Sequence, residues 1–184
     1  MQQLLSAHPD LSSRLIADDT PVDLIEQQID VAIRVGNPTQ QSARIVKIGV
    51  LREALYCSPS YIDGKGGSPD SLAALEEWDH IANDWQGSPV TYAGPSKDSI
   101  RVTPRFRCNT VRDVFQFAVS GAGVALLPEP IAEPAVGQKS LKHLFSVSST
   151  PIYAVHLFEK RAPAKVKRFI ALLKQVLGEF PEYE

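Results

Sequence analysis

Short apolar runs alternate along this chain with segments of helical periodicity, and this alternation constrains the fold more than any other feature. The run Ile29–Val35 is nearly continuous in apolar residues, which is typical of a strand buried on both faces. Before it, Leu11–Ala17 has the composition of a strand, and Thr20–Pro21 favours the start of a helix that continues to Gln28. The repeated order of strand and helix predicts an α/β fold with a largely parallel sheet.

The rest of the chain continues this alternation. Asn109–Thr110 is predicted to cap a helix whose apolar residues fall on one face, and Gly121 is well placed to end it. Two strand-like segments, Val46–Cys57 and Pro151–Phe158, are long enough to pass between two lobes. We therefore expect two small α/β lobes with a cleft between them. The same patterns predict short helices opening at 58–59, 68–69 and 130, a surface loop over 87–99, strands over 100–108 and 124–127, and a last helix over 163–177.

Composition excludes several classes of protein. The formal net charge of −2 argues against a nucleic-acid-binding surface, because such a surface needs an excess of Lys and Arg. The chain has only two cysteines, Cys57 and Cys108, which is too few for a disulfide framework. No stretch approaches the roughly 20 apolar residues of a membrane span, and the first residues lack the pattern of a signal peptide. We expect a cytoplasmic protein with no membrane partner.

Catalytic and metal-binding motifs are not found. The four histidines show no metal-ligand spacing with each other or with the cysteines, so no metal site is expected. There is no serine-hydrolase elbow, phosphate loop or dinucleotide fingerprint. A nucleophile at Cys57 with a distant histidine stays a weak alternative, because nothing near Cys57 would activate the thiol. We predict that the protein is not an enzyme and uses no cofactor.

Capped helix starts are the remaining chemical feature. Thr20–Pro21 and Asn109–Thr110 each follow a predicted strand and offer unpaired backbone amides at the start of a helix. Ligands of open α/β sheets lie outside the carboxyl ends of the strands, and helix starts favour anions. Arg34 stands at the end of a buried strand and would add a full positive charge. If these groups converge on one cleft, they predict a site for a small carboxylate.

Four blocks of sequence resemble the effector-binding domain of LysR-type transcriptional regulators, in order and over nearly the whole chain. They are residues 20–36 (TPVDLIEQQIDVAIRVG), 55–61 (LYCSPSY), 109–111 with 121–128 (NTV and GAGVALLP), and the closing helix around Phe169–Ile170. The resemblance implies a periplasmic-binding-protein-like α/β fold (type 2) with a ligand cleft between two subdomains. Subdomain I would comprise 1–50 and 152–184, and subdomain II would comprise 51–151.

The resemblance also implies a function. A small, anionic effector would bind in the cleft of a homodimer or higher oligomer and thereby modulate transcription. The family binds DNA through a helix-turn-helix domain, which is absent from these residues, so the chain alone is not expected to bind an operator. The candidate ligand-binding residues are Thr20, Arg34, Val35, Gly36, Asn109, Thr110, Val111 and Pro128.

One departure from the family concerns the first strand, which is missing here. In the family this strand lies between those matching Leu11–Ala17 and Ile29–Val35. Its loss would leave two strands facing each other across a gap with unpaired amides and carbonyls, which is costly when buried. We expect the gap to close by rearrangement or by a segment of another chain, unless the natural protein is longer upstream.

Two other functions remain open at this point. The first is a solute-binding protein of a transporter, which shares the fold class but would need a secretory signal or a lipid-attachment cysteine. The second is a ligand-free truncated chain that acts as a dimerisation partner of full-length regulators.

Overall fold

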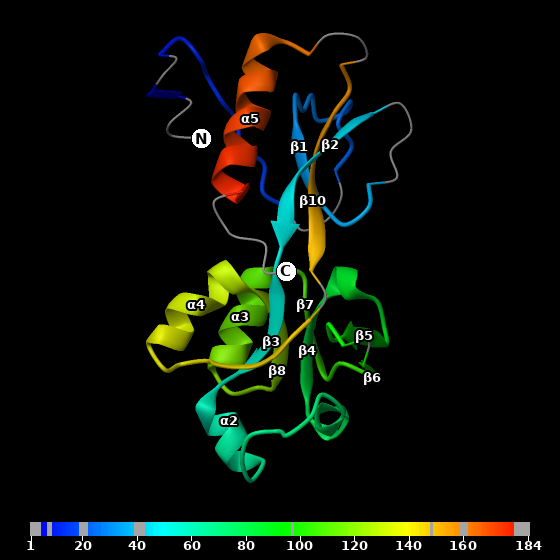
Figure 1. Cartoon of the computed structure of the whole chain (residues 1–184), viewed down its shortest axis with the longest axis vertical. Helices are drawn as coiled ribbons and strands as arrows, with labels where there is room; N and C mark the ends of the chain where they lie inside the picture. Colours follow the sequence, from blue (N-terminus) through cyan, green and yellow to red (C-terminus); the bar gives the residue numbers. More distant parts are fainter. Residues whose placement is uncertain are drawn as a thin grey trace. The chain divides into compact units, whose positions relative to one another are not determined.

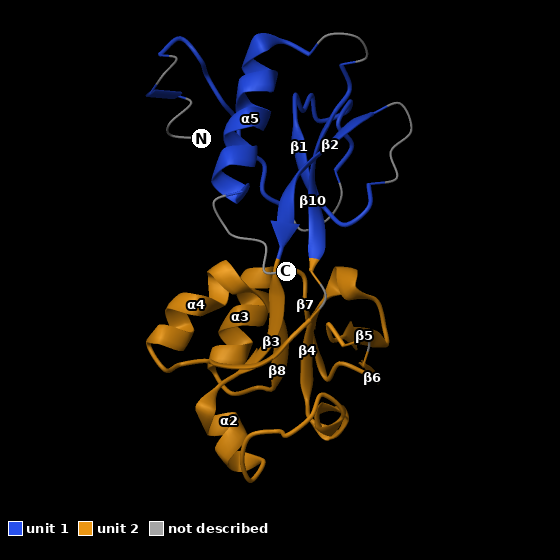
Figure 2. Cartoon of the chain, in the orientation of Figure 1, with its two compact units in different colours: residues 1–51, 150–184 blue, residues 52–149 orange. Residues whose placement is uncertain are grey.

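The computed structural model describes residues 5–6, 9–18, 22–38, 43–96, 98–147, 149–158 and 162–178 (Figure 1). The chain divides into two compact units (Figure 2). Unit 1 comprises residues 1–51 and 150–184, and unit 2 comprises residues 52–149. In the ranges given above, no helix is long and apolar enough to cross a membrane.

Unit 1 is built on a three-stranded antiparallel sheet, in the order β1 (Ala32–Val35), β10 (Thr150–His156), β2 (Arg44–Leu51). The helix α5 (Ala164–Gly178) packs on one face of this sheet. Its buried Val166 and Ile170 contact Ile48 and Ile152, which confirms the predicted amphipathic last helix.

The first part of unit 1 differs from the prediction. Leu11–Ala17 was expected to form a strand, and this was wrong, because the segment has no regular secondary structure. Thr20 and Pro21 lie outside the described residues. Residues 24–28 form turns instead of the predicted helix, and the Asp23 carboxylate accepts hydrogen bonds from two of the following amides. A strand needs a hydrogen-bonding neighbour, and among the described residues Leu11–Ala17 has none, so the expected strand–helix–strand unit does not form.

Unit 2 is built on a five-stranded mixed sheet. Its order is β7 (Phe106–Cys108), β4 (His80–Asn83), β8 (Val124–Pro128), β3 (Glu53–Cys57), β9 (Lys142–Ser146). The strands β7, β4 and β8 are parallel, whereas β3 is antiparallel to both of its neighbours. The predicted segment Val46–Cys57 therefore forms two strands, β2 and β3, which Arg52 separates.

Alternate residues of each strand point to opposite faces of this sheet, and both faces are covered. On one face, Ala54 and Tyr56 pack against the helices α3 (Val111–Val119) and α4 (Glu129–Gly137). On the other face, Leu55 and Cys57 pack in a core with the hairpin β5 (Val90–Ala93) and β6 (Ser99–Val102). The same core includes residues of two short helices, α2 (Pro59–Gly64) and η1 (Ala73–Glu77), and of the segment just before η1. A further short helix, η2 (Asp84–Gln86), follows β4.

Several local predictions for unit 2 are confirmed and two are wrong. Ser58 accepts a hydrogen bond from the Tyr61 amide and caps α2, and Gly121 adopts φ +87° just after α3, as the sequence predicts. The expected surface loop over 87–99 contains the strand β5, which pairs with β6. The expected strand over 100–108 is two strands, β6 and β7, because Pro104 lies between them and has no amide hydrogen for a ladder.

Candidate functional site

The candidate residues of unit 1 lie at the end of β1. Arg34 is half-buried, and its Nη2 atom donates a 2.6 Å hydrogen bond to the carbonyl oxygen of Val22. Val35 is exposed, and Gly36 adopts φ +82° while its amide donates a 2.9 Å hydrogen bond to the Pro151 carbonyl. Arg34 thus already holds the turn before β1, and any ligand would share its guanidinium with this backbone contact.

The candidate residues of unit 2 gather at the carboxyl ends of parallel strands. Asn109, Thr110 and Val111 follow β7 and open α3, and Pro128 ends β8. Because β7, β4 and β8 are parallel neighbours, their carboxyl ends share one edge of the sheet. The structure thus brings these four residues to the same edge, with the end of β4 between them.

Thr110 is the residue that caps α3. Its Oγ1 atom accepts a 3.1 Å hydrogen bond from the Asp113 amide and donates a 2.7 Å hydrogen bond to the Asp113 carboxylate. Asn109 is exposed, and Val111 is the first residue of the helix. The Asp113 carboxylate already complements the positive end of the helix dipole. An anionic ligand at this helix start would therefore have to compete with Asp113.

Sequence reasoning missed the end of β4, which lies between β7 and β8. The Asn83 side chain accepts a hydrogen bond from the Trp85 amide, and the Gln86 side chain accepts a 2.7 Å hydrogen bond from the Asn83 amide. Trp85 is largely exposed next to this closed turn. An Asn followed three residues later by Gln is a capping pattern that can be recognised in a sequence. This pattern was the signal from which the turn after β4 could have been predicted.

Arg107 adds positive charge to the same edge. Its guanidinium donates to the carbonyl oxygens of Gly87, Asn83 and Asp84 at 2.8–3.2 Å, and its Nε lies 3.4 Å from the Asp84 carboxylate. Arg107 therefore holds the loop after β4 in place. Because its guanidinium already has these acceptors and the Asp84 carboxylate, little of its positive charge is left to attract a ligand.

A nucleophilic role for Cys57 is not supported by its surroundings. The side chain is fully buried, and this burial raises the pKa of the thiol to about 12, so the thiol stays protonated at neutral pH. Within the described part of the chain, no three His, Cys, Asp or Glu side chains are grouped as metal ligands would be.

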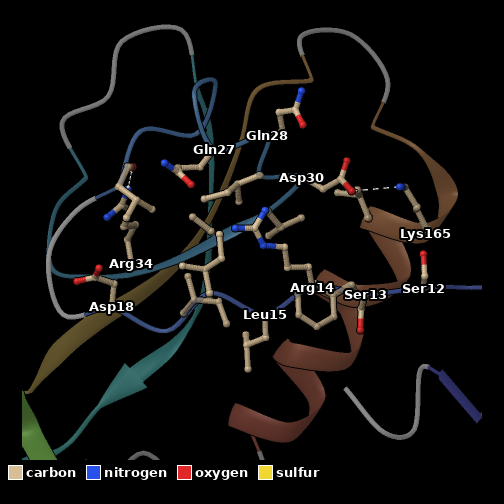
Figure 3. Close-up of a pocket in the computed structure, with 18 of the residues that line it drawn as sticks. Ser12, Ser13, Arg14, Leu15, Asp18, Gln27, Gln28, Asp30, Arg34 and Lys165 are labelled. Atoms are coloured by element: carbon tan, nitrogen blue, oxygen red, sulfur yellow. Dashed lines mark hydrogen bonds and ion pairs between the residues drawn. The ribbon is translucent and has the colours of Figure 1, made fainter.

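Unit 1 contains a pocket of about 470 Å³ (Figure 3). It lies between residues 11–18, β1 and the first turns of α5. Of the predicted ligand-binding residues that the structure describes, Arg34 alone lines this pocket. The residues of the helix start in unit 2 do not contribute to it.

With this geometry in place, comparison with known families decides the identity of the domain. The family model of the LysR substrate binding domain matches residues 1–178. The chain belongs to this family. The LysR substrate-binding domain described here is 26% identical over 181 residues to the HTH-type transcriptional regulator PtxR of Pseudomonas aeruginosa, an alignment that covers 94% of this chain and 57% of the relative. It is also 26% identical over 191 residues to the HTH-type transcriptional regulator DmlR of Escherichia coli, covering 98% of this chain and 61% of that protein. The chain thus spans less than two thirds of the length of these relatives.

Solved structures show the same fold. The regulatory domain of CrgA, a LysR-type regulator from Neisseria meningitidis, matches with a TM-score of 0.81 at 21% identity, over 96% of this chain and 89% of that one. The regulatory domain of AphB from Vibrio vulnificus matches with a TM-score of 0.75 at 21% identity, over 95% of this chain and 89% of that one. The LysR substrate-binding domain therefore has the periplasmic-binding-protein-like α/β fold of type 2.

Proposed function

We propose that this LysR substrate-binding domain is the effector-sensing part of a transcriptional regulator and binds a small anionic metabolite. The observation that carries the proposal is the family match over residues 1–178. Binding would use Arg34 and its neighbours in unit 1, and the amides at the start of α3 with Pro128 in unit 2. The effector changes transcription only if it binds the assembly states of the regulator unequally. Contact with DNA belongs to a helix-turn-helix domain outside these residues, and no catalytic step is part of this function.

Titration calorimetry with sodium acetate, succinate and 2-oxoglutarate tests the effector site. We expect at least one of these carboxylates to bind, and R34A to weaken that binding roughly tenfold to a hundredfold, because a charged hydrogen bond is lost. R101A is the matched control, since Arg101 is an exposed residue of β6. Unchanged affinity in R34A would exclude the proposed role of Arg34, and binding of none of the three carboxylates would contradict the anionic effector.

We also propose that the domain forms a homodimer or higher oligomer through the edge of unit 2. The rings of Phe106 and Phe117 stack with centroids 6.0 Å apart, yet they remain 37% and 44% exposed. Phe106 belongs to β7, one of the two edge strands of the five-stranded sheet. Exposed aromatic residues beside an open strand edge are typical of an interaction surface. This surface equally supports the second candidate function, a dimerisation partner that binds no ligand.

Sedimentation velocity separates these two functions. F117D should shift the association equilibrium toward monomer, whereas the control I131D, on the exposed face of α4, should not. A domain that associates and binds none of the carboxylates is a dimerisation partner only. A domain that stays monomeric at all concentrations contradicts the proposed surface.

A further inference from the structure

Trp85 is the most exposed large apolar residue in the described part of unit 2, with 55% of its surface accessible. Its indole forms no hydrogen bond, ion pair or ring contact with another described residue. Trp78, the other tryptophan, instead packs against the Tyr61 ring, with the two centroids 5.6 Å apart. An indole left in water forgoes the large gain that burial of an aromatic side chain provides. The surface of Trp85 is therefore available to a ligand.

The backbone that carries Trp85 is held on both sides. The Asn83 side chain accepts a hydrogen bond from the Trp85 amide, and the Gln86 side chain accepts one from the Asn83 amide. Arg107 donates to the carbonyl oxygens of Asn83 and Gly87, which flank the turn. A ligand that binds an already ordered surface loses less conformational entropy than one that has to order a loop. These hydrogen bonds therefore fix the position of Trp85 and leave its indole uncovered.

Trp85 also lies beside the edge of the sheet that carries the other candidate residues of unit 2. It follows the end of β4 by two residues, and β4 lies between the parallel strands β7 and β8. Thr110 follows β7 and Pro128 ends β8, so all three residues stand at the carboxyl ends of neighbouring strands. Ligands of open α/β sheets bind outside these ends. Trp85 is thus an apolar group at the place where the proposed effector would contact unit 2.

The charges next to Trp85 decide which ligands its ring can attract. A free carboxylate beside an indole would favour a cationic ligand, because cations bind over the faces of aromatic rings. Asp84 is not free, since its carboxylate lies 3.4 Å from Nε of Arg107. The guanidinium of Arg107 is engaged as well, by this carboxylate and by the backbone carbonyls. Contact with Trp85 therefore depends on the uncharged surface of the ligand.

An aromatic ring gains more from an indole face than a saturated ring does. Two aromatic rings in an offset-stacked or edge-to-face arrangement attract each other beyond the effect of the area that they bury. A saturated ring of similar size buries a similar area without this additional attraction. A rigid and exposed indole thus discriminates between ligands by the aromatic character of their rings.

We propose that Trp85 stacks on an aromatic ring of the effector, so that the effector of this domain is an aromatic carboxylate. This inference rests on the proposed function, in which a small anion binds at this edge of unit 2. The carboxylate would keep the contacts proposed for it, and Trp85 would add specificity for the ring. Trp85 is therefore a specificity-determining residue of the effector site.

Titration calorimetry of the whole chain with two carboxylates tests the proposal. Benzoate and cyclohexanecarboxylate carry the same charge on rings of similar size, but only benzoate is aromatic. We expect benzoate to bind about threefold to tenfold more tightly, because stacking adds to the effect of the buried area. Equal binding of the two, tighter binding of cyclohexanecarboxylate, or no binding of benzoate would overturn the proposal.

Variants at position 85 assign the preference to the indole. W85L keeps an apolar side chain without an aromatic face, so it should bind the two carboxylates equally, whereas W85F should keep part of the preference. I45A is the matched control, because it shortens an apolar side chain of β2 that is 42% exposed, and it should keep the full preference. A preference that persists unchanged in W85L would place the ring elsewhere and contradict the proposal.

Tryptophan emission locates the bound ring. The chain has two tryptophans, so the emission of W85F comes from Trp78 alone. Benzoate should change the emission of the wild-type chain and leave that of W85F unchanged, because the stacked ring contacts only the indole of Trp85. A change of equal size in W85F would show that the ring lies beside Trp78, and the proposal would be wrong.

Three further probes separate this proposal from the proposed function. If succinate and cyclohexanecarboxylate bind but benzoate has no advantage, the anionic effector stands and the role of Trp85 fails. If uncharged benzamide binds as tightly as benzoate, and W85L weakens both, Trp85 still recognises an aromatic ring and only the anionic effector fails. Binding of choline in place of benzoate, lost in W85L, would show that Trp85 recognises a cation and would overturn the proposal.

Discussion

Apolar strands of similar composition are buried to different extents in the two units. In unit 2, the adjacent residues Leu55 and Tyr56 of β3 are 0% and 2% exposed, because the strand has a neighbour on each side and cover on both faces. In unit 1, β10 is the one strand of the described residues that pairs with β1, and every second side chain of β1 is exposed. The difference teaches that an apolar run becomes a central strand only where neighbouring chain satisfies its backbone on both sides.

Hydrogen exchange should show the largest contrast between the units. The amides of Ile33 and Val35 point away from β10, and no backbone hydrogen bond within the described residues reaches them, so they should exchange quickly. The amides of Leu55 and Leu127 should exchange only on global unfolding. We expect protection factors that differ by about a thousandfold or more, because opening free energies range from near zero to the full stability. Arg34, whose amide pairs with β10, is the internal control. Strong protection of Ile33 in a dilute monomer would show that the gap beside β1 is closed.

Core truncations should show the next largest contrast. L127A removes a fully buried side chain from the core of unit 2 and should lower the free energy of unfolding by about 3 kcal/mol. I33A truncates a half-exposed side chain and should lower it by less than about 1 kcal/mol. Urea unfolding followed by circular dichroism measures both changes. Equal losses would mean that Ile33 is covered in solution.

The cap of α3 should contribute less than the core. T110A removes the acceptor for the Asp113 amide and should cost about 1 kcal/mol of unfolding free energy. T103A is the control, because Thr103 is exposed between β6 and β7. Tryptophan fluorescence reports on unit 2, which holds both Trp78 and Trp85. A loss as large as that of L127A would indicate that Thr110 does more than cap the helix.

A pH titration should show the smallest contrast. Burial lowers the pKa of His80, although its hydrogen bond with the Leu75 carbonyl and the charge of Asp79 oppose the shift. The unfolded chain therefore binds a proton at His80 more readily than the folded chain does, and stability falls as the pH drops below 6.5 toward the folded pKa. Unfolding of unit 2 at pH 8 and pH 5.5 measures this loss, and H80Q should reduce it. An H80Q slope identical to that of the wild type would assign the pH dependence to other groups.

Local signals in the sequence predicted much of unit 2. The helix α3 follows from a Thr at its cap and apolar residues on one face, and α2 follows from Ser58–Pro59. The strand β4 escaped prediction because it has only four residues and begins and ends with the polar residues His80 and Asn83. Both polar side chains are buried and form hydrogen bonds, and the hydropathy of single residues does not reveal these partners.

Unit 1 and the candidate site were harder to predict because they depend on distant residues. Leu11–Ala17 has the composition of a strand, but its conformation depends on whether a neighbour is present. The backbone contact of Arg34 with Val22 could not be read from either residue alone. The competition between Asp113 and an anion at α3 could have been anticipated, since an acidic residue in the first turn is the usual complement of a capping Thr. The ligand-binding roles of the eight candidate residues stay predictions.

The different burial of the two cysteines gives the domain a natural position for a spectroscopic reporter. Cys57 is buried in the core of unit 2, while Cys108 is only half-buried and ends β7, three residues before the start of α3. A thiol-directed dye would therefore modify Cys108 selectively, without any mutation, although the raised pKa of this thiol slows the reaction. The dye would then stand beside Asn109 and Thr110, where its emission could follow metabolite screening in real time.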